Sequence, residues 1–371
     1  MTKPSTGCRM TRRPRAGRRS AGQVSGEKAV HSPARAVEAR PAAVVRAPRR
    51  VGDGMDEVVR VVRDPEAAAL TVGLAAVILA ASREEPRVLT VPVAGQPPGR
   101  GEGLPSGPLE PAHPTLERGL RAWVERKTGQ TLGYVEQLYT FGDRDRRPGG
   151  GGPHALSVAY LALVREAKPA ADSAWQSWYR YFPYEDWRGG RPALLDALGA
   201  RLAAWAEAAP EAGARTRRHD RIGLAFGSAE AGWNEERVLE RYELLFEAGL
   251  VPEAGAAETL AGQPMALDHR RMLATALGRL RGKIKYRPVV FELMPPTFTL
   301  GQLQRAVEAL AGVRLHKQNF RRLVAQQGLV EETDAISGET GGRPARLMRF
   351  RREVLLERPA PGLRLPPGRR G

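Results

Sequence analysis

Cysteine is almost absent from this sequence of 371 residues, in which Cys8 is the single example. One thiol cannot form an internal disulfide, and it cannot provide the cysteine ligands of a zinc ribbon. A protein of this composition needs no oxidising compartment, so we expect it to act in the reducing cytoplasm.

Long apolar runs are lacking as well. The longest extends from Leu70 to Ala81, which is well short of the roughly 20 apolar residues that a helix needs to cross a bilayer. Its length and its content of Val, Leu and Ile favour a buried β-strand. We therefore expect no transmembrane segment.

Sets of side chains for metal binding or nucleophilic catalysis are also missing. His219 and His269 have no Cys, Asp or Glu partners at ligand spacing. No combination of Ser, His and Asp can be assigned as a catalytic triad. The sequence thus predicts no catalytic residue and no metal site.

What the sequence does have is a strong positive charge, formally +17, concentrated at the two ends of the chain. Residues 1–50 hold 13 Lys and Arg against 2 Asp and Glu, and residues 281–371 hold 18 against 8. A basic module suits a polyanion, because release of the counterions around phosphates gives affinity for nucleic acid of any sequence. The charge indicates a nucleic-acid partner for the C-terminal part.

Residues 1–64 are predicted to form a disordered basic tail, because they are rich in Arg, Ala, Pro, Ser and Gly and show no helical or strand period. The tail either adds non-specific affinity for DNA or has no specific role. Met55 is a possible alternative start, which would leave the folded part intact.

The stretch 287–350 has the pattern of a winged helix-turn-helix. Thr299 and Gln302 form a capping-box signature at the start of an amphipathic helix, which Gly312 would end. A second helix is predicted from Lys317 to Gln327. Two short strands around a Gly-rich tip follow and would form a basic wing.

In the second helix, Phe320, Leu323 and Val324 share one face, so the opposite face is polar. Such side chains suit a major groove, because Arg pairs with guanine and Asn or Gln with adenine. From this helix, the wing and the segment before them, the predicted DNA-binding residues are Lys317, Gln318, Asn319, Arg321, Arg322, Gln326, Arg343, Arg346, Lys283 and Lys285. For any single Arg, an ordinary solvated surface is the alternative.

The segment between the tail and the winged helix alternates strands and helices. Strands are predicted at 70–79, 87–92, 132–141 and 155–164, the first two as a hairpin, and a helix is predicted at 115–127. This order indicates a mixed α/β domain. Further helices are predicted at 192–208, 235–248 and 269–281, with a charged linker at 215–220.

These elements define the predicted domain organisation. The boundaries are 1–64 for the tail, 65–208 for the α/β domain, 209–281 for a helical linker, 282–356 for the winged helix domain and 357–371 for a second tail. The linker helices would either join the two domains or form a dimer element.

Several segments together resemble one known family. Leu104 to Gly129 resembles a Nudix box, and residues 137–143 are similar to a strand of the Nudix-related transcriptional regulators of bacterial NAD metabolism. Residues 291–300, 319–322 and 342–345 resemble the winged helix of that family. The resemblance implies an α/β (α+β) Nudix-like mixed-sheet sandwich, then a helical linker and a winged helix-turn-helix. It also implies a homodimer that binds double-stranded operator DNA and takes ADP-ribose or a related nucleotide as its effector.

The resemblance does not extend to the catalytic chemistry of Nudix hydrolases. Those enzymes hold Mg²⁺ with glutamates on one helix face. When the glycine that ends the Nudix box is aligned with Gly129, the positions of these glutamates are occupied by residues of Ala122–Trp123 and Arg126–Lys127. A shift of one residue recovers only Glu125. Cationic side chains repel Mg²⁺, so we expect neither hydrolysis nor a required cofactor.

Effector binding does not need that chemistry. The candidate effector-binding residues are Gly107, Glu110, Glu125, Trp187 and Arg188. The last two are included because an aromatic ring beside Arg can stack an adenine. Solvated surface charge is the alternative for the glutamates, and core packing is the alternative for the aromatic stretch 175–188.

The resemblance therefore favours a transcriptional repressor whose catalytically degenerate Nudix-like domain senses a nucleotide. The first alternative is an active Nudix hydrolase with an accessory DNA-binding domain. The second is a basic nucleic-acid-binding protein without an effector.

Overall fold

The computed structural model describes residues 71–82, 84–95, 101–142, 155–170, 172–228, 232–338 and 344–363. The chain separates into two units, Met1–Val62 and Arg63–Gly371, and every described residue belongs to the second unit. The predicted basic tail, Cys8 and Arg343 lie outside the described residues.

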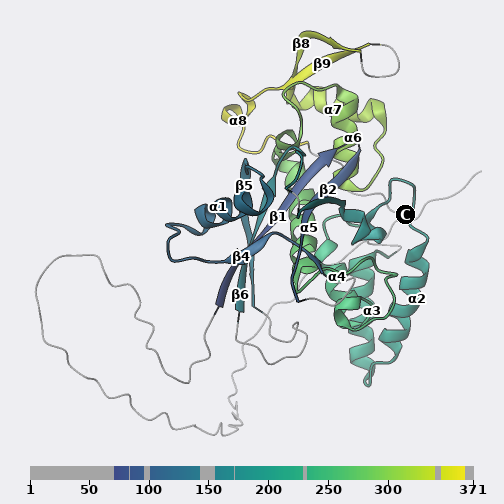
Figure 1. The fold of residues 1–371 in the computed structure, drawn as a ribbon. Helices are drawn as coiled ribbons and strands as arrows, with labels where there is room; N and C mark the ends of the chain where they lie inside the picture. Colours follow the sequence, from purple (N-terminus) through teal and green to yellow (C-terminus); the bar gives the residue numbers. More distant parts are fainter. Residues whose placement is uncertain are drawn as a thin grey trace, which may run out of the picture. The chain divides into compact units, whose positions relative to one another are not determined.

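A mixed β-sheet forms the N-terminal part of the second unit (Figure 1). β1 (Thr71–Ser82) and β2 (Glu85–Pro92) make the predicted antiparallel hairpin. β6 (Ala155–Leu163) runs parallel to β1, and β5 (Tyr134–Phe141) runs antiparallel to β6. The short strands β3 (Glu102–Gly103) and β7 (Ala174–Ser177) pair with β2, and β4 (Ser106–Pro108) pairs with β1. The prediction of a mixed α/β domain is confirmed.

Both faces of β1 are covered, which explains its nearly continuous apolar sequence. Its even-numbered residues, such as Ile78, pack with Val124 of α1 (Leu116–Thr128) on one face. Its odd-numbered residues, such as Leu79, belong to a larger cluster on the other face, which includes Tyr242 and Leu273. The sheet is thus a central layer between α1 and the helices described below.

Helix α1 has the predicted ends. The Thr115 hydroxyl accepts a hydrogen bond from the Arg118 N–H at 3.2 Å, and Gly129 ends the helix with φ 66°. Residues with a Cβ rarely adopt this left-handed conformation, so glycine suits the end of the helix. The capping residues therefore fix α1 in register against the sheet.

A set of packed helices follows the sheet. It consists of α2 (Leu194–Glu207), α3 (Ala212–Phe226), α4 (Val238–Glu247) and α5 (His269–Tyr286), with the 3₁₀ helices η2 (Trp178–Arg180) and η3 (Pro183–Glu185) before α2 and η4 (Pro252–Ala254) before α5. α2 packs on α3, α3 on α4 and α4 on α5 (Figure 1). No helix within the described ranges is both long and apolar enough to span a membrane.

Residues 215–220, predicted to be a linker, lie inside α3, so that prediction was wrong. Polar contacts hold α3 in place: Arg218 donates to the Trp205 carbonyl of α2 at 2.6 Å, and Arg221 pairs with Glu247 of α4 at 2.5 Å. Ala225 is the buried residue of α3. A helix held mainly by charged side chains shows little apolar period, which is the usual sign of a helix in a sequence.

Two predicted boundaries fall within packed structure. α5 continues without a break past residue 281 to Tyr286. Beyond α8 (Val354–Glu357), Leu363 is buried, and its N–H donates to the Ile284 carbonyl at 3.0 Å. The described part of the predicted C-terminal tail therefore packs on α5.

The C-terminal part forms the predicted winged helix. Thr299 and Gln302 make the capping box of α6 (Leu300–Ala311), and Gly312 ends α6 with φ 76°. α7 (Lys317–Gln327) has the predicted bounds. The wing consists of the antiparallel strands β8 (Val330–Ser337) and β9 (Ala345–Phe350), and η5 (Val289–Leu293) connects α5 to this domain.

The Thr299 cap provides a prediction about stability. Replacing Thr299 by Ala removes the hydroxyl that accepts from the Gln302 N–H at 3.1 Å, and we expect the free energy of unfolding to fall by about 1 kcal/mol. Thr297→Ala is the control, because Thr297 is exposed and precedes the helix. In urea denaturation, the midpoint concentration should be lower for Thr299→Ala than for the wild type and unchanged for Thr297→Ala. Equal midpoints in all three proteins would contradict the capping role.

Candidate functional site

The exposed face of α7 carries the side chains predicted to contact DNA. Phe320 and Val324 are 2% and 1% exposed and hold the opposite face in the core, while Leu323 is half-buried. The exposed residues are Lys317, Gln318, Asn319, Arg321, Arg322 and Gln326. Within the described part of the chain, no carboxylate pairs with the cations of this set. These cations can therefore meet phosphates or base edges without breaking such a pair.

The turn between α6 and α7 is fixed by Glu308. Its carboxylate accepts from the Leu315 N–H at 2.9 Å and from the Gln304 amide at 2.8 Å, and it pairs with Arg314 at 2.8 Å. Burial alone would raise the pKa of Glu308, but these donors lower it below its usual range. The ionised carboxylate therefore ties the start of α7 to α6.

The described strands of the wing are not the basic surface that was predicted. Arg346 pairs with Glu332 at 2.6 Å, and Arg349 pairs with Glu331 at 2.5 Å, across the two strands. β8 also carries Asp334, so acidic residues outnumber basic ones on β8 and β9. Each arginine uses one nitrogen in its ion pair and is more than 60% exposed, so its charge is offset by the carboxylate while its other N–H groups remain accessible. The predicted contact between Arg346 and DNA stays a prediction.

Lys283 and Lys285, predicted to meet phosphate, are engaged within the protein. The Lys283 ammonium contacts the Glu136 carboxylate of β5. Lys285 lies 2.8 Å from Glu235 and 2.6 Å from Glu236, in the segment before α4. These ion pairs join α5 to the sheet and to its neighbouring helix. A phosphate contact for either lysine stays a prediction.

Of the predicted effector-binding residues, three belong to the segment from β4 to α1. Gly107 packs against Trp123, because a Cβ at Gly107 would lie 1.8 Å from the indole ring. Glu110 pairs with Arg126 at 3.2 Å, and Glu125 is exposed on α1. Gly107 thus has a packing role, and the two glutamates are surface charges. Contact of any of the three with an effector stays a prediction.

The face of α1 that would carry metal ligands in a Nudix box does not fit a metal ion. Trp123 is 8% exposed, and the Lys127 ammonium lies 4.6 Å from the centre of its ring. Within the described residues, no group of three His, Cys, Asp and Glu side chains could hold a metal ion. An aromatic ring and a cation supply no oxygen ligands to Mg²⁺, so these two positions of α1 do not fit the ion.

Trp187 and Arg188 lie where residues after the sheet meet the winged helix. The Trp187 N–H donates to the Gly312 carbonyl at 2.7 Å, and its ring packs on Trp233 with centroids 4.7 Å apart. Arg188 pairs with Glu85 of β2 at 3.2 Å. These contacts set the two residues apart from the β4–α1 segment, where the other candidates lie.

The remaining aromatic residues of 175–188 are mostly core. The fully buried ones are Trp178, Tyr181, Phe182 and Tyr184, each 0% exposed. Burial raises the pKa of Tyr179 to about 12, so its hydroxyl stays protonated, and it donates to the Ala309 carbonyl at 2.7 Å. Packing is therefore the role that the structure gives to this stretch.

Sequence patterns gave no sign of a buried ion cluster formed by Glu185, Arg241 and Arg281. Arg241 Nε lies 2.5 Å from one carboxylate oxygen of Glu185, and Arg281 Nη1 lies 2.5 Å from the other. All three side chains are at most 1% exposed. No local signal marks such a cluster, because its members come from η3, α4 and α5.

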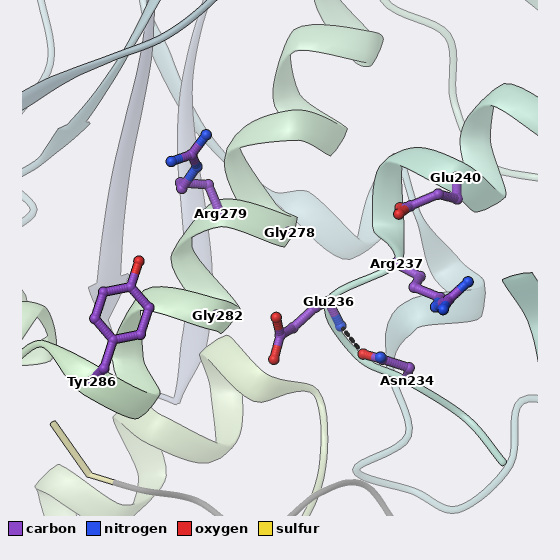
Figure 2. Close-up of a pocket in the computed structure, with 8 residues that line it drawn as sticks. All are labelled: Asn234, Glu236, Arg237, Glu240, Gly278, Arg279, Gly282 and Tyr286. Carbon is purple, nitrogen blue, oxygen red and sulfur yellow. Dashed lines mark hydrogen bonds between the residues drawn. The ribbon is translucent and has the colours of Figure 1, made fainter. Parts of the chain in front are cut away.

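A pocket of about 490 Å³ opens between α5 and the segment that enters α4 (Figure 2). It is lined by Asn234, Glu236, Arg237, Glu240, Gly278, Arg279, Gly282 and Tyr286. None of the predicted effector-binding residues is among them. Its two carboxylates balance its two guanidiniums, whereas a diphosphate calls for an excess of cationic donors. The lining is therefore poorly suited to a nucleotide diphosphate.

The close contact of Gly107 with Trp123 leads to a prediction. In Gly107→Ala the added methyl group would collide with the indole, and overpacking of this kind costs about 1–3 kcal/mol. The control is Gly133→Ala, for which the nearest atom to the added Cβ is 3.9 Å away. Thermal unfolding should show a lower Tm for Gly107→Ala alone. An unchanged Tm would contradict the packing role of Gly107.

The C-terminal part of the chain matches known proteins in sequence. Residues 290–350 match the NrtR DNA-binding winged helix domain. Over 86 residues the chain is 45% identical to the ADPR responsive transcriptional repressor NtrR of Acinetobacter baylyi, a match that covers 23% of this chain and 34% of that repressor. The matched region thus spans about a third of the length of this curated relative.

Solved structures show similarity over longer stretches. Shewanella oneidensis NrtR complexed with a 27mer DNA is 21% identical with a TM-score of 0.47, and the match covers 76% of this chain and 94% of that one. A MutT/nudix family protein from Enterococcus faecalis is 16% identical with a TM-score of 0.46, and the match covers 77% and 88%. In sequence, the similarity to a DNA-binding family is that of residues 290–350 to the NrtR DNA-binding winged helix domain.

Proposed function

We propose that the protein is a transcriptional repressor that binds operator DNA through α7 and responds to a nucleotide such as ADP-ribose. The observation that carries this proposal is the exposed polar face of α7, on a domain that matches a DNA-binding family. A helix of this kind fits the major groove, where Arg, Asn and Gln pair with base edges. The relative named as an ADPR responsive transcriptional repressor supports the nucleotide part.

The proposal includes a homodimer that acts in the cytoplasm. One helix of the length of α7 contacts only a few base pairs, and a two-fold pair of such helices doubles the contact. The operator would then be a palindrome with half-sites about one helical turn apart.

In this proposal the α/β domain binds its nucleotide without hydrolysing it. Trp123, Arg126 and Lys127 stand at helix positions where a Nudix hydrolase needs carboxylates. Without oxygen ligands for Mg²⁺, the charge of a diphosphate is not neutralised and the attacking water is not activated. A sensor benefits from this loss, because the effector persists while it is bound.

The DNA part is tested by titration with DNA from upstream of the protein's own gene, at about 150 mM salt, the physiological range. The wild type should prefer this DNA to unrelated DNA by about 10³ or more. Arg321→Ala and Arg322→Ala should each weaken specific binding by about 1–3 kcal/mol if they pair with bases. Arg217→Ala, which removes an exposed cation from α3, is the control. Equal losses in all variants would indicate a charge-driven interaction only.

The sensor part is tested by incubating the protein with ADP-ribose and Mg²⁺. A ligand at 100 times its Kd stabilises the folded state by about 2.7 kcal/mol, so Tm should rise. The ADP-ribose should be recovered intact, because Trp123, Arg126 and Lys127 stand where the resemblance to a Nudix box calls for carboxylates. Release of AMP would establish a hydrolase instead. No rise in Tm would favour a basic nucleic-acid-binding protein without this effector.

A further inference from the structure

The C-terminal end of α6 is capped by residues from outside the winged helix. The last carbonyls of a helix have no partner within it and need other donors. The Ala309 carbonyl accepts from the Tyr179 hydroxyl at 2.7 Å, and the Leu310 carbonyl accepts from Arg281 Nε at 3.0 Å. Just beyond the helix, the Gly312 carbonyl accepts from a backbone N–H of the segment after η3, at 2.7 Å. The end of α6 is therefore docked on the rest of the unit.

Arg281 links this docking point to the buried ion cluster. One carboxylate, Glu185, faces two guanidiniums, Arg281 and Arg241. The excess positive charge is taken up by carbonyls, among them that of Leu310, where the helix dipole of α6 is negative. Burial would lower the pKa of Arg281, but Glu185 and Tyr179 more than offset this and raise it. Arg281 is thus a permanent charge placed between η3 and α6.

The contact between η3 and the end of α6 leaves no room for a side chain at Gly312. Its φ is 76°, and a Cβ there would lie 2.4 Å from the Glu185 carbonyl oxygen and 3.0 Å from both Arg281 Nη2 and the Tyr179 hydroxyl. The backbone of η3 and the end of α6 are therefore in direct contact. A movement of η3 would be passed on to α6, and Glu308 links α6 to the turn before α7 through the Leu315 N–H.

A second contact holds α6 against the sheet. Arg305 of α6 pairs with Glu84 in the turn between β1 and β2 at 2.8 Å. The carbonyl of Glu84 accepts from Arg188 Nη1 at 2.6 Å. Two contacts on one helix restrict its rotation as well as its position, so the sheet sets the direction of α6.

Helix α5 connects the docking point to the segment that resembles a Nudix box. His269, the first residue of α5, accepts from the Leu104 N–H at 3.0 Å through Nδ1. Burial lowers the pKa of His269 to about 4, so the ring is a neutral acceptor at physiological pH. Arg281 lies on the same unbroken helix, about three turns further along at 3.6 residues per turn. A shift of Leu104 would therefore act on the first residue of the helix that carries Arg281.

We propose that Tyr179, Glu185, Arg281 and Gly312, here called the α6 joint, are positioning residues that set the orientation of α7 on DNA in response to the effector. This inference rests on the proposed function and specifies how the two binding events are coupled. The coupling is reciprocal: an effector that favours one arrangement of the joint changes DNA affinity, and DNA changes effector affinity by the same factor. Trp187 and Arg188, first considered as effector contacts, belong to the surroundings of this joint.

The test uses the full-length protein, operator DNA and ADP-ribose as the probe. The Kd for DNA is measured with and without saturating ADP-ribose in the wild type, Tyr179→Phe and Arg281→Lys. Tyr179→Phe removes a single hydroxyl, and Arg281→Lys keeps the charge but loses the forked hydrogen bonds. The controls make the same changes at exposed residues of α5: Tyr286→Phe and Arg279→Lys, with exposed fractions of 46% and 47%.

We expect the wild type and both controls to show a ratio of the two Kd values of about 5–150, the usual range of allosteric coupling. In the two joint variants the ratio should fall towards one, while the Kd for ADP-ribose measured without DNA stays at its wild-type value. A purely structural role would lower Tm and leave the ratio unchanged. If Arg281→Lys fails to fold, Tyr179→Phe alone decides the outcome, since it changes the least.

The outcomes separate the joint from the proposed function. Wild-type ratios in folded joint variants would overturn the role of the joint and leave the regulator intact. A wild-type ratio of one, despite binding of both ligands, would overturn the effector response and the joint with it. Loss of the ratio in the controls as well would overturn the assignment to these residues.

Discussion

The Glu185 carboxylate is completely buried and accepts hydrogen bonds from two helices, α4 through Arg241 and α5 through Arg281. Removing one partner of a buried ion pair costs about 3–5 kcal/mol, because the other charge is left uncompensated. Neither helix can therefore leave η3 without a large loss of stability. Since Arg281 also holds the Leu310 carbonyl of α6, the position of the winged helix depends on the same carboxylate. A polar contact of this kind is directional, and apolar packing alone would permit sliding.

In helix α1, the residues that shape the backbone differ from those that would carry catalysis. The Thr115 cap and the Gly129 end are requirements of the backbone, and both are present. Metal-binding carboxylates are requirements of catalysis. In the resemblance to a Nudix box Trp123 stands at one of their positions, and it packs on Gly107. The helix still covers one face of the sheet through Leu120 and its neighbours. The residues that hold this helix in place are thus different from those that would bind a metal ion.

Most of the elements could be predicted from the sequence, because their ends carry local signals. α7 was predicted to the residue, since Gly328 ends it in the left-handed conformation and its apolar residues keep a helical period. α3 was missed because charged contacts replace that period. The places of Trp187 and of the wing arginines could not be predicted, because they depend on pairings between distant segments, such as Trp187 with Gly312 and Glu331 with Arg349. A sequence shows which side chains exist, and only the folded structure shows which carboxylate pairs with which cation.

These ion pairs also reduce the number of cations in the C-terminal part that are free to contact DNA. Many of its cations are committed within the protein: Arg281, Lys283, Lys285, Arg305, Arg314, Arg346, Arg349 and Arg351 each contact a carboxylate. Each phosphate that a protein neutralises adds about 0.9 to the slope of log affinity against log salt for duplex DNA, and cations already paired with carboxylates contribute little to that slope. In the proposed complex the cations of α7, which pair with no carboxylate among the described residues, remain available to phosphates. In the proposed regulator, discrimination between DNA sequences would come from base contacts of α7 and from the angle at which α6 presents it.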